Sequence, residues 1–210
     1  MPTVTLDPLD LAALLCSRVC HDVISPVGAI INGLEVLDDS DAGMRDFALD
    51  LIRKSAGQAS ARLQFARLAF GAAGSAGASI DLGDAEQVAR GMFTEDKLSL
   101  SWTGPRALFP KNKVKLLLNL IMIATSAVPR GGSIAVRIEG DGERCVFTLL
   151  AKGPHARLPA HAEHLIAGEP ESGVVDAHGI QPFYTGRVAE AAGMAVAMSI
   201  EGDEVTIRAA

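Results

Sequence analysis

Aromatic side chains are scarce in this chain of 210 residues, which has seven Phe, one Tyr and one Trp. Stacking platforms for bases or sugars therefore cannot be numerous. The three cysteines cannot form a fully paired disulfide framework. Basic residues are in deficit, because 25 Asp plus Glu face 19 Lys plus Arg and the net charge is -6. The chain lacks the basic surplus that draws proteins to phosphate backbones or anionic lipid, so we expect no nucleic-acid partner.

Long uncharged apolar runs are also lacking. The longest, Leu116 to Val128, is interrupted by polar residues and stops at Pro129, short of the roughly 18 residues expected of a membrane-spanning helix. The first residues, MPTVTLDPLD, contain no basic region of the kind found in secretory signals. We therefore expect a cytoplasmic protein with no membrane partner. Hydrophobic residues still make up 49% of the chain, which is enough for a packed core.

Two segments in the first third of the chain carry a helical pattern of apolar residues. Residues 8–37 repeat apolar side chains at spacings of three, four and seven, and a second pattern spans about 44–70, after the turn formers DDSDAG. These patterns predict a helical hairpin over residues 1–71. Two such helices cannot by themselves cover both of their apolar stripes, so we expect a second copy to complete a four-helix bundle in a homodimer.

A stretch of Gly, Ala and Ser predicts a flexible linker at residues 72–79. Residues 80–210 mix helical and strand patterns, which predicts an α/β sandwich with a mixed sheet and makes the whole chain α+β. The expected helices lie at about 84–93, 111–128, 159–167 and 181–192. The expected strands lie at 98–102, 133–139, 145–150, 194–200 and 204–208.

His21 occupies a polar face of the first predicted helix. At 100° per residue, six polar or small residues fall within about 60° of it, namely Ser17, Arg18, Ser25, Gly28, Asn32 and Glu35. The apolar residues that a bundle core needs lie on the opposite side, so we expect His21 to point outward. Ile24 and Ile31 flank the polar face, an arrangement expected where another protein lays an apolar patch around the histidine.

Pro26 is expected to bend the helix one turn after His21, because it cannot donate a hydrogen bond to the Asp22 carbonyl. Ser25 and Gly28 leave room for a phosphoryl group or a partner backbone near the imidazole. An imidazole, with a reference pKa of about 6.5, is largely neutral near pH 7 and has one nitrogen free to attack phosphorus. The adjacent Asp22 can fix the tautomer, so the segment predicts a phosphohistidine carrier.

The run His21-Asp22-Val23-Ile24-Ser25-Pro26 resembles the H-box of two-component histidine kinases. The wider segment CHDVISPVGAIINGLEVL, residues 20–37, and the short chain are similar to the ChpT histidine phosphotransferases, and this resemblance covers the whole chain. It implies a dimerisation and histidine phosphotransfer hairpin, followed by a degenerate version of the ATP-binding domain of a histidine kinase.

Departures from the kinase pattern lie in the second half of the chain. The segment LLLNLIMIATSAVPRGGSI resembles the N-box helix, with Asn119 at its first asparagine but Ile123 where a magnesium-binding asparagine is expected. In LLAKGPHARLP, Ala151 replaces the adenine-reading aspartate and His155 replaces a glycine. VDAHGIQPFYTGRVAEAAG stands in place of the glycine-rich loop. The resemblance therefore implies a protein with no ATP, metal or other cofactor of its own, and with Mg²⁺ supplied by a receiver domain.

In that family, a phosphoryl group passes from the receiver aspartate of a hybrid histidine kinase of the CckA type to the receivers of CtrA-like and CpdR-like response regulators. The resemblance assigns His21 as the phosphorylated residue and Asp22 as its catalytic neighbour. The residues expected to bind the receivers are Arg18, Ile24, Ser25, Gly28, Ile31 and Asn32. A solvated arginine explains Arg18 equally well.

Two other patterns suggest metal or redox chemistry. His161-Ala162-Glu163 matches half of the zinc deaminase signature, with His155 and His164 nearby, but no cysteine follows Cys145 to complete it. An exposed polar helix is the simpler interpretation of this segment.

Cys16 and Cys20 stand close to His21 without further ligands, and we expect them to be buried as small hydrophobic residues. Two alternative functions remain open on the sequence. One is an ATP-using histidine kinase, and the other is a non-catalytic dimeric adaptor that docks receiver domains.

Overall fold

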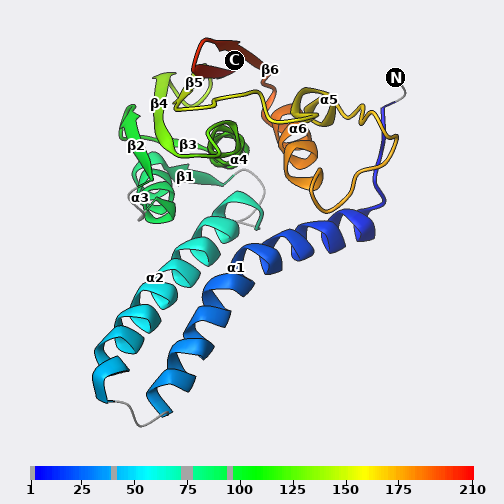
Figure 1. Ribbon diagram of the computed structural model, residues 1–210. Helices are drawn as coiled ribbons and strands as arrows, with labels where there is room; N and C mark the ends of the chain where they lie inside the picture. Colours follow the sequence, from blue (N-terminus) through cyan, green and yellow to red (C-terminus); the bar gives the residue numbers. More distant parts are fainter. Residues whose placement is uncertain (1–2, 39–41, 72–77, 94–96) are drawn as a thin grey trace.

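The computed structural model describes residues 3–38, 42–71, 78–93 and 97–210. A long helical hairpin projects from a part that contains the sheets (Figure 1). Helix α1 spans Pro8–Asp38, and helix α2 spans Arg45–Ala69 after a short 3-10 turn, η1, at Ala42–Met44. Both helices begin and end within one or two residues of the predicted bounds, because each keeps its apolar pattern over its whole length.

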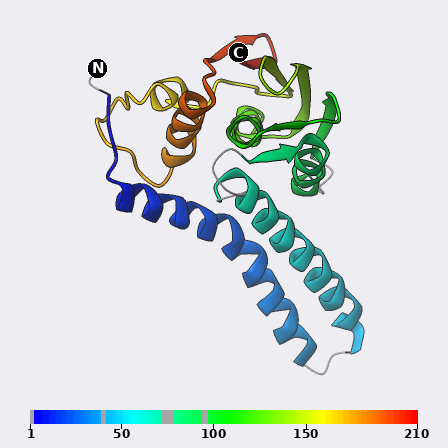
Figure 2. The ribbon, with the colours of Figure 1, turned by 180° about the vertical axis from the view of Figure 1, so that it is seen from behind.

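Helix α1 bends near its middle, and the bend is seen from both sides of the molecule (Figures 1 and 2). Pro26 lies inside α1 and is buried, so the bend is explained by its missing N–H group and the bulk of its ring. Beyond Pro26 the two helices pack closely at Gly33, where an added Cβ would lie 2.7 Å from Ile52 Cγ1. The first half of α1 diverges from α2 and runs beneath α6 (Figure 1).

The main sheet has five strands in the order β2-β4-β5-β7-β6. Strand β2 is parallel to β4, and the other neighbours are antiparallel, so the sheet is mixed as predicted. The strands are β2 (Leu98–Thr103), β4 (Gly132–Gly140), β5 (Cys145–Lys152), β6 (Val196–Glu201) and β7 (Glu204–Ala209). Two three-residue strands that the sequence analysis missed, β1 (Ser79–Asp81) and β3 (Leu108–Pro110), pair with each other in a second sheet.

The helices of this part are α3 (Leu82–Met92), α4 (Lys111–Ala127), α5 (Ala162–Ile166) and α6 (Ile180–Ala192). Strands β4, β5 and β7 alternate buried with more exposed residues, so one face of the sheet forms the core. Helix α4 contributes most of its residues to that core, including Leu116, Leu117 and Leu120, which are fully buried. The result is a two-layer α/β sandwich, which confirms the expected α+β fold.

Some bounds differ from the predicted ones. Helix α5 covers five residues instead of the nine expected at 159–167, because His161 adopts a left-handed conformation at its N-cap (φ 59°). Strand β1 begins at Ser79, the last residue of the predicted linker. Residues 72–77 of that linker lie outside the described residues, so the division into 1–71, 72–79 and 80–210 stays a prediction.

The N-terminal segment ties the hairpin to the sheet-containing part. The backbone N–H of Val4 donates a hydrogen bond to the carbonyl of Gly168 at 2.7 Å. Side chains from this segment and from the start of α1 pack against a small buried cluster around α5 and α6. That cluster is Leu165, Val175, Ile180 and Phe183, and the residues packed on it are Val4, Leu6, Leu11, Leu14 and Leu15.

By length and composition alone, α1 is the one helix in the described part of the chain that could cross a membrane. This helix contains no long uncharged run, because it carries Arg18 and Asp22. A soluble helix that packs its apolar residues in a bundle meets the same criterion. Because ionisable side chains are costly in the middle of a lipid bilayer, the length and composition of α1 are weak evidence for a membrane span.

Candidate functional site

His21 lies on α1 with 79% of its side chain exposed, which confirms that it points outward. Its Nδ1 atom is 3.4 Å from Oδ1 of Asp22, the next residue in the chain. A carboxylate at this distance favours a proton on Nδ1, and this leaves Nε2 with its lone pair. The exposed imidazole is therefore positioned to react with a group brought by another molecule.

Asp22 is held at both its side chain and its backbone. Arg18 Nε donates to Asp22 Oδ2 at 3.0 Å, one turn back on the same helix. Arg62 Nη1, from α2, donates to the backbone carbonyl of Asp22 at 2.5 Å. Arg62 was not among the site residues predicted from the sequence. The signal for it was Pro26, because a proline in a helix frees the carbonyl four residues earlier and calls for another donor, although it does not say which residue supplies it.

The other predicted site residues surround His21 on an open surface. Ile24 and Ile31 are 70% and 52% exposed, and Ser25 and Asn32 are exposed. An added Cβ at Gly28 would meet no atom within 4 Å, so the space at Gly28 itself is open. The structure pairs Arg18 with Asp22 instead of leaving it solvated. That these residues bind a partner stays a prediction.

A cavity of about 710 Å³ lies where the hairpin meets the sheet-containing part. Arg18, Asp22 and Arg62 line it from the hairpin, and Lys97 and Arg130 line it from the loops that flank β2 and β4. Four cationic side chains thus line this space together with one carboxylate, that of Asp22, the residue that follows His21. Such a space favours an anionic group or an acidic partner surface.

The expectation that Cys16 and Cys20 are buried is wrong for the single chain, because both are exposed. They lie on a face of α1 that also carries Leu9, Val27 and Leu34, all exposed. This face is turned away from α2, and helical periodicity alone does not say which side of α1 the second helix covers. Cys145, in contrast, is buried, and burial raises the pKa of its thiol.

The residues that would bind a nucleotide in a kinase have other roles here. Asn119 is fully buried, and its Nδ2 donates to the carbonyls of Ala69 (3.2 Å) and Lys115 (2.9 Å). Its Oδ1 accepts a hydrogen bond from Gln181 Nε2 at 3.3 Å. Ile123, at the position of the expected metal ligand, is buried and apolar. These residues do not fit a nucleotide-bound magnesium ion, since the amide is already used and the second ligand is missing.

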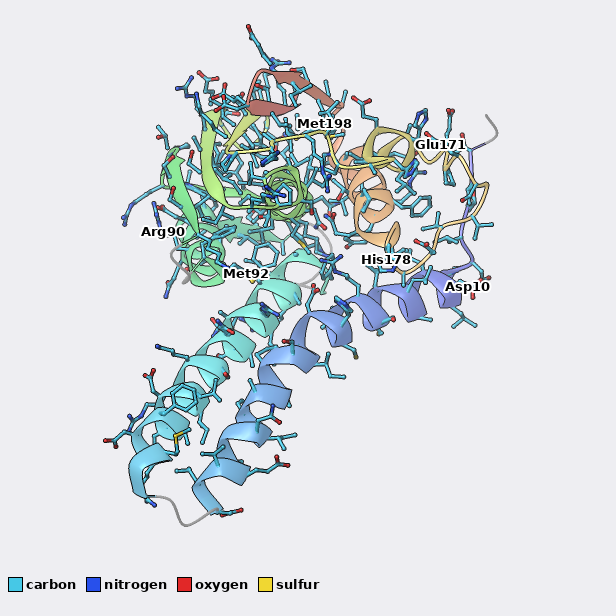
Figure 3. All side chains as sticks on the ribbon, viewed as in Figure 1. Asp10, Arg90, Met92, Glu171, His178 and Met198 are labelled. Carbon is cyan, nitrogen blue, oxygen red and sulfur yellow. The ribbon has the colours of Figure 1, made fainter. Side chains whose placement is uncertain are left out.

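A second cavity, of about 460 Å³, lies between α1, α4 and the segment that joins α5 to α6. Figure 3 labels two residues of this segment that line the cavity, Glu171 and His178. His161 Nδ1 and His164 Nε2 lie 3.0 and 3.5 Å from the two carboxylate oxygens of Glu171.

The zinc interpretation of His161-Ala162-Glu163 has no support in the structure. His155, the more distant histidine of that pattern, pairs with Arg130 through Nε2 at 2.9 Å. No group of three or more His, Cys, Asp or Glu side chains that could hold a metal ion occurs among the residues described.

The chain combines an exposed histidine on a long helical hairpin with a mixed α/β sandwich, a fold that resembles the catalytic part of histidine kinases. Residues 82–204 match the family described as the histidine phosphotransferase C-terminal domain. Protein phosphotransferase ChpT of Brucella abortus (strain 2308) is 52% identical over 206 residues, which cover 98% of each chain. The chain belongs to the ChpT-type histidine phosphotransferases.

Two solved structures support the fold. A bacterial phosphotransferase solved at 1.7 Å has 48% identity and a TM-score of 0.91, with 100% of both chains covered. Full-length ShkA in complex with AMPPNP has 21% identity and a TM-score of 0.50, with 97% of this chain and 45% of that chain covered. At that identity, the similarity to ShkA concerns the fold alone.

Proposed function

We propose that this protein relays a phosphoryl group through His21 between the aspartates of receiver domains, without using ATP. The observation that carries the proposal is the exposed imidazole with Nδ1 3.4 Å from the Asp22 carboxylate, on the hairpin of a histidine phosphotransferase. The alternatives are an ATP-using histidine kinase and a receiver-docking adaptor that does no chemistry.

The chemistry needs little from the protein beyond position and charge. The lone pair of His21 Nε2 attacks the phosphorus of an aspartyl phosphate on the donor receiver. The new N–P bond forms as the O–P bond breaks, and the donor aspartate leaves as a carboxylate. The proton stays on Nδ1, where the negative charge of Asp22 balances the positive charge that develops on the ring. Attack by an acceptor aspartate on the same phosphorus reverses the step and restores the neutral imidazole.

We propose that the donor is the receiver of a hybrid histidine kinase of the CckA type, and that the acceptors are CtrA-like and CpdR-like receivers. Exposed Ile24 and Ile31 offer an apolar contact beside His21. The cations that line the cavity next to it complement a receiver's acidic phosphorylation pocket. A magnesium ion would come with the receiver, and a cytoplasmic location without a membrane partner is part of the same proposal.

We propose a homodimer formed by pairing of the hairpins. The face of α1 with Leu9, Val27 and Leu34 is apolar and uncovered in the single chain, and a second copy would bury it in a four-helix bundle. Cys16 and Cys20 lie on this face and would then be buried. Light scattering at micromolar concentration is expected to give twice the mass of the chain, and a monomeric mass would contradict the dimer.

The test of the relay is transfer of radiolabelled phosphate from a phosphorylated receiver. Wild-type protein should take up the label and pass it to a second receiver, whereas His21→Ala should take up none. His164→Ala is the matched control, because His164 is an exposed histidine that lies on α5 and not on the hairpin, and it should transfer normally. An adaptor would show no difference between wild type and His21→Ala, and a kinase would label itself when incubated with ATP and Mg²⁺.

A further inference from the structure

Pro26 deprives one peptide carbonyl in the interior of helix α1 of its usual partner within the helix. In an α-helix, the carbonyl of residue 22 would accept a hydrogen bond from the N–H of residue 26, but residue 26 is Pro26 and has no N–H. The Asp22 carbonyl lies in a partly buried position. A backbone carbonyl left unpaired in such a position is costly. This carbonyl belongs to the residue that directly follows His21.

Arg62 supplies the missing donor from the other helix of the hairpin. Its Nη1 donates to the Asp22 carbonyl at 2.5 Å, although the two residues are 40 apart in the sequence. A guanidinium is a charged donor, and charge-assisted hydrogen bonds are stronger than those between neutral groups. Helix α2 therefore replaces the hydrogen bond that Pro26 removes from α1.

The two arginines hold Asp22 at two different groups. Arg18 pairs with its carboxylate at 3.0 Å, while Arg62 pairs with its carbonyl. We infer that Arg62 is a positioning residue of the phosphotransfer site. By pairing with the carbonyl freed by Pro26, it ties the bend of α1 to α2 and so sets the direction in which His21 faces its substrate. This inference rests on the proposed function and adds to it a residue that does not touch the reacting atoms.

A simpler role for Arg62 predicts different behaviour. Arg62 also lines the 710 Å³ cavity, where its charge alone would attract an acidic receiver. Loss of such an attraction weakens receiver binding and does not depend on Pro26. Loss of positioning slows transfer from a receiver that is already bound. The effect of removing Arg62 then depends on Pro26, because the Asp22 carbonyl needs a donor from outside α1 only when residue 26 is proline.

The experiment is a double-mutant cycle of Arg62→Met and Pro26→Ala in the full chain. Arg53→Met is the matched control, because it removes an exposed arginine from α2. At saturating phosphorylated receiver, Arg62→Met should slow transfer to His21 by about tenfold or more, since small misplacements of reacting groups cost up to about 100-fold. Arg18, Lys97 and Arg130 still line the cavity in this variant, so the receiver concentration at half-maximal rate should rise by less than about threefold, a smaller change than that in the transfer rate. Arg53→Met should leave both values unchanged.

In the Pro26→Ala background, the N–H of residue 26 can pair with the Asp22 carbonyl, so Arg62→Met should slow transfer by less than about threefold. Thermal unfolding gives a second readout that does not depend on transfer. Arg62→Met should lower the unfolding midpoint of the native sequence by about 5 °C, and that of Pro26→Ala by clearly less. If Pro26→Ala is itself a slow phosphotransferase, the unfolding cycle still tests whether Arg62 pairs with the carbonyl that Pro26 frees, and the ratio of rates with and without Arg62 is compared within each background.

The inference would be overturned if Arg62→Met changed the transfer rate and the unfolding midpoint equally in both backgrounds. It would also be overturned if Arg62→Met raised the receiver concentration at half-maximal rate and left the rate at saturation unchanged. The proposed function fails in a different way. In that case, the wild-type protein takes up no label from any receiver. Positioning by Arg62 would then be overturned as well, while the unfolding cycle would still show whether Arg62 pairs with the carbonyl.

Discussion

Replacing Asn119 by Ala tests whether the asparagine inherited from the kinase pattern has become a structural residue. Asn119 is fully buried on α4, and its amide bridges three elements. It donates to the carbonyl of Ala69 at the end of α2 and to Lys115 within α4, and it accepts from Gln181 on α6. The Ala69 carbonyl is one of the last in α2 and has no partner within its own helix.

The expected loss follows from these contacts. Asn119→Ala leaves the Ala69 carbonyl without this donor in a buried position, which costs about 1–3 kcal/mol. The Gln181 amide keeps the backbone carbonyl of residue 119 and the hydroxyl of Thr185 as acceptors, so its own loss is small. Removal of a buried side chain adds a small cavity. We expect the free energy of unfolding to fall by about 2–4 kcal/mol in total.

The assay is urea denaturation followed by circular dichroism. The matched control is Asn112→Ala on the same helix, where the side chain is more exposed and donates a single hydrogen bond, to Ala191 at 3.3 Å. The control should change the free energy of unfolding by about 0.5 kcal/mol or less. Equal midpoints for the two variants would refute the structural role of Asn119. Magnesium-dependent ATP binding that is lost in Asn119→Ala would return the residue to the kinase role.

Two further predictions concern packing and pH. Gly33→Ala should destabilise the hairpin by about 1–2 kcal/mol, because the new Cβ meets Ile52 Cγ1 at 2.7 Å. Gly57→Ala is the control, because its new Cβ meets nothing within 4 Å. It should stabilise the hairpin by up to about 1 kcal/mol in the same denaturation assay. Backbone N–H groups, chiefly that of Gly179, hold the pKa of Asp176 below its ordinary value of 3.8. Asp176 therefore stabilises the fold above that value and loses its effect as the pH falls through its lowered pKa. Wild type should be more stable than Asp176→Asn by up to about 1 kcal/mol at pH 7, a value reduced for the exposed carboxylate. The difference should vanish as the pH falls below the lowered pKa of Asp176. A difference that is constant with pH would contradict this.

The larger elements could be predicted because each carries a long periodic pattern. Helices α1 and α2 and the strands of the main sheet lie within a few residues of their expected bounds. The short strands β1 and β3 were missed because three residues are too few to show alternation, and their pairing joins segments that are distant in the sequence. Helix α5 was overestimated because the left-handed conformation of His161 cannot be recognised from composition.

The amino-acid sequence by itself determined the outward direction of His21 and the bend at Pro26. These features depend on residue type and on spacing along one helix, which are local properties. Only the tertiary structure decided which side of α1 is covered by α2, and therefore that Cys16 and Cys20 are exposed in the single chain. It also decided that Arg62 reaches the Asp22 carbonyl. Contacts between residues 40 apart depend on how two helices pack, and no local pattern specifies that packing.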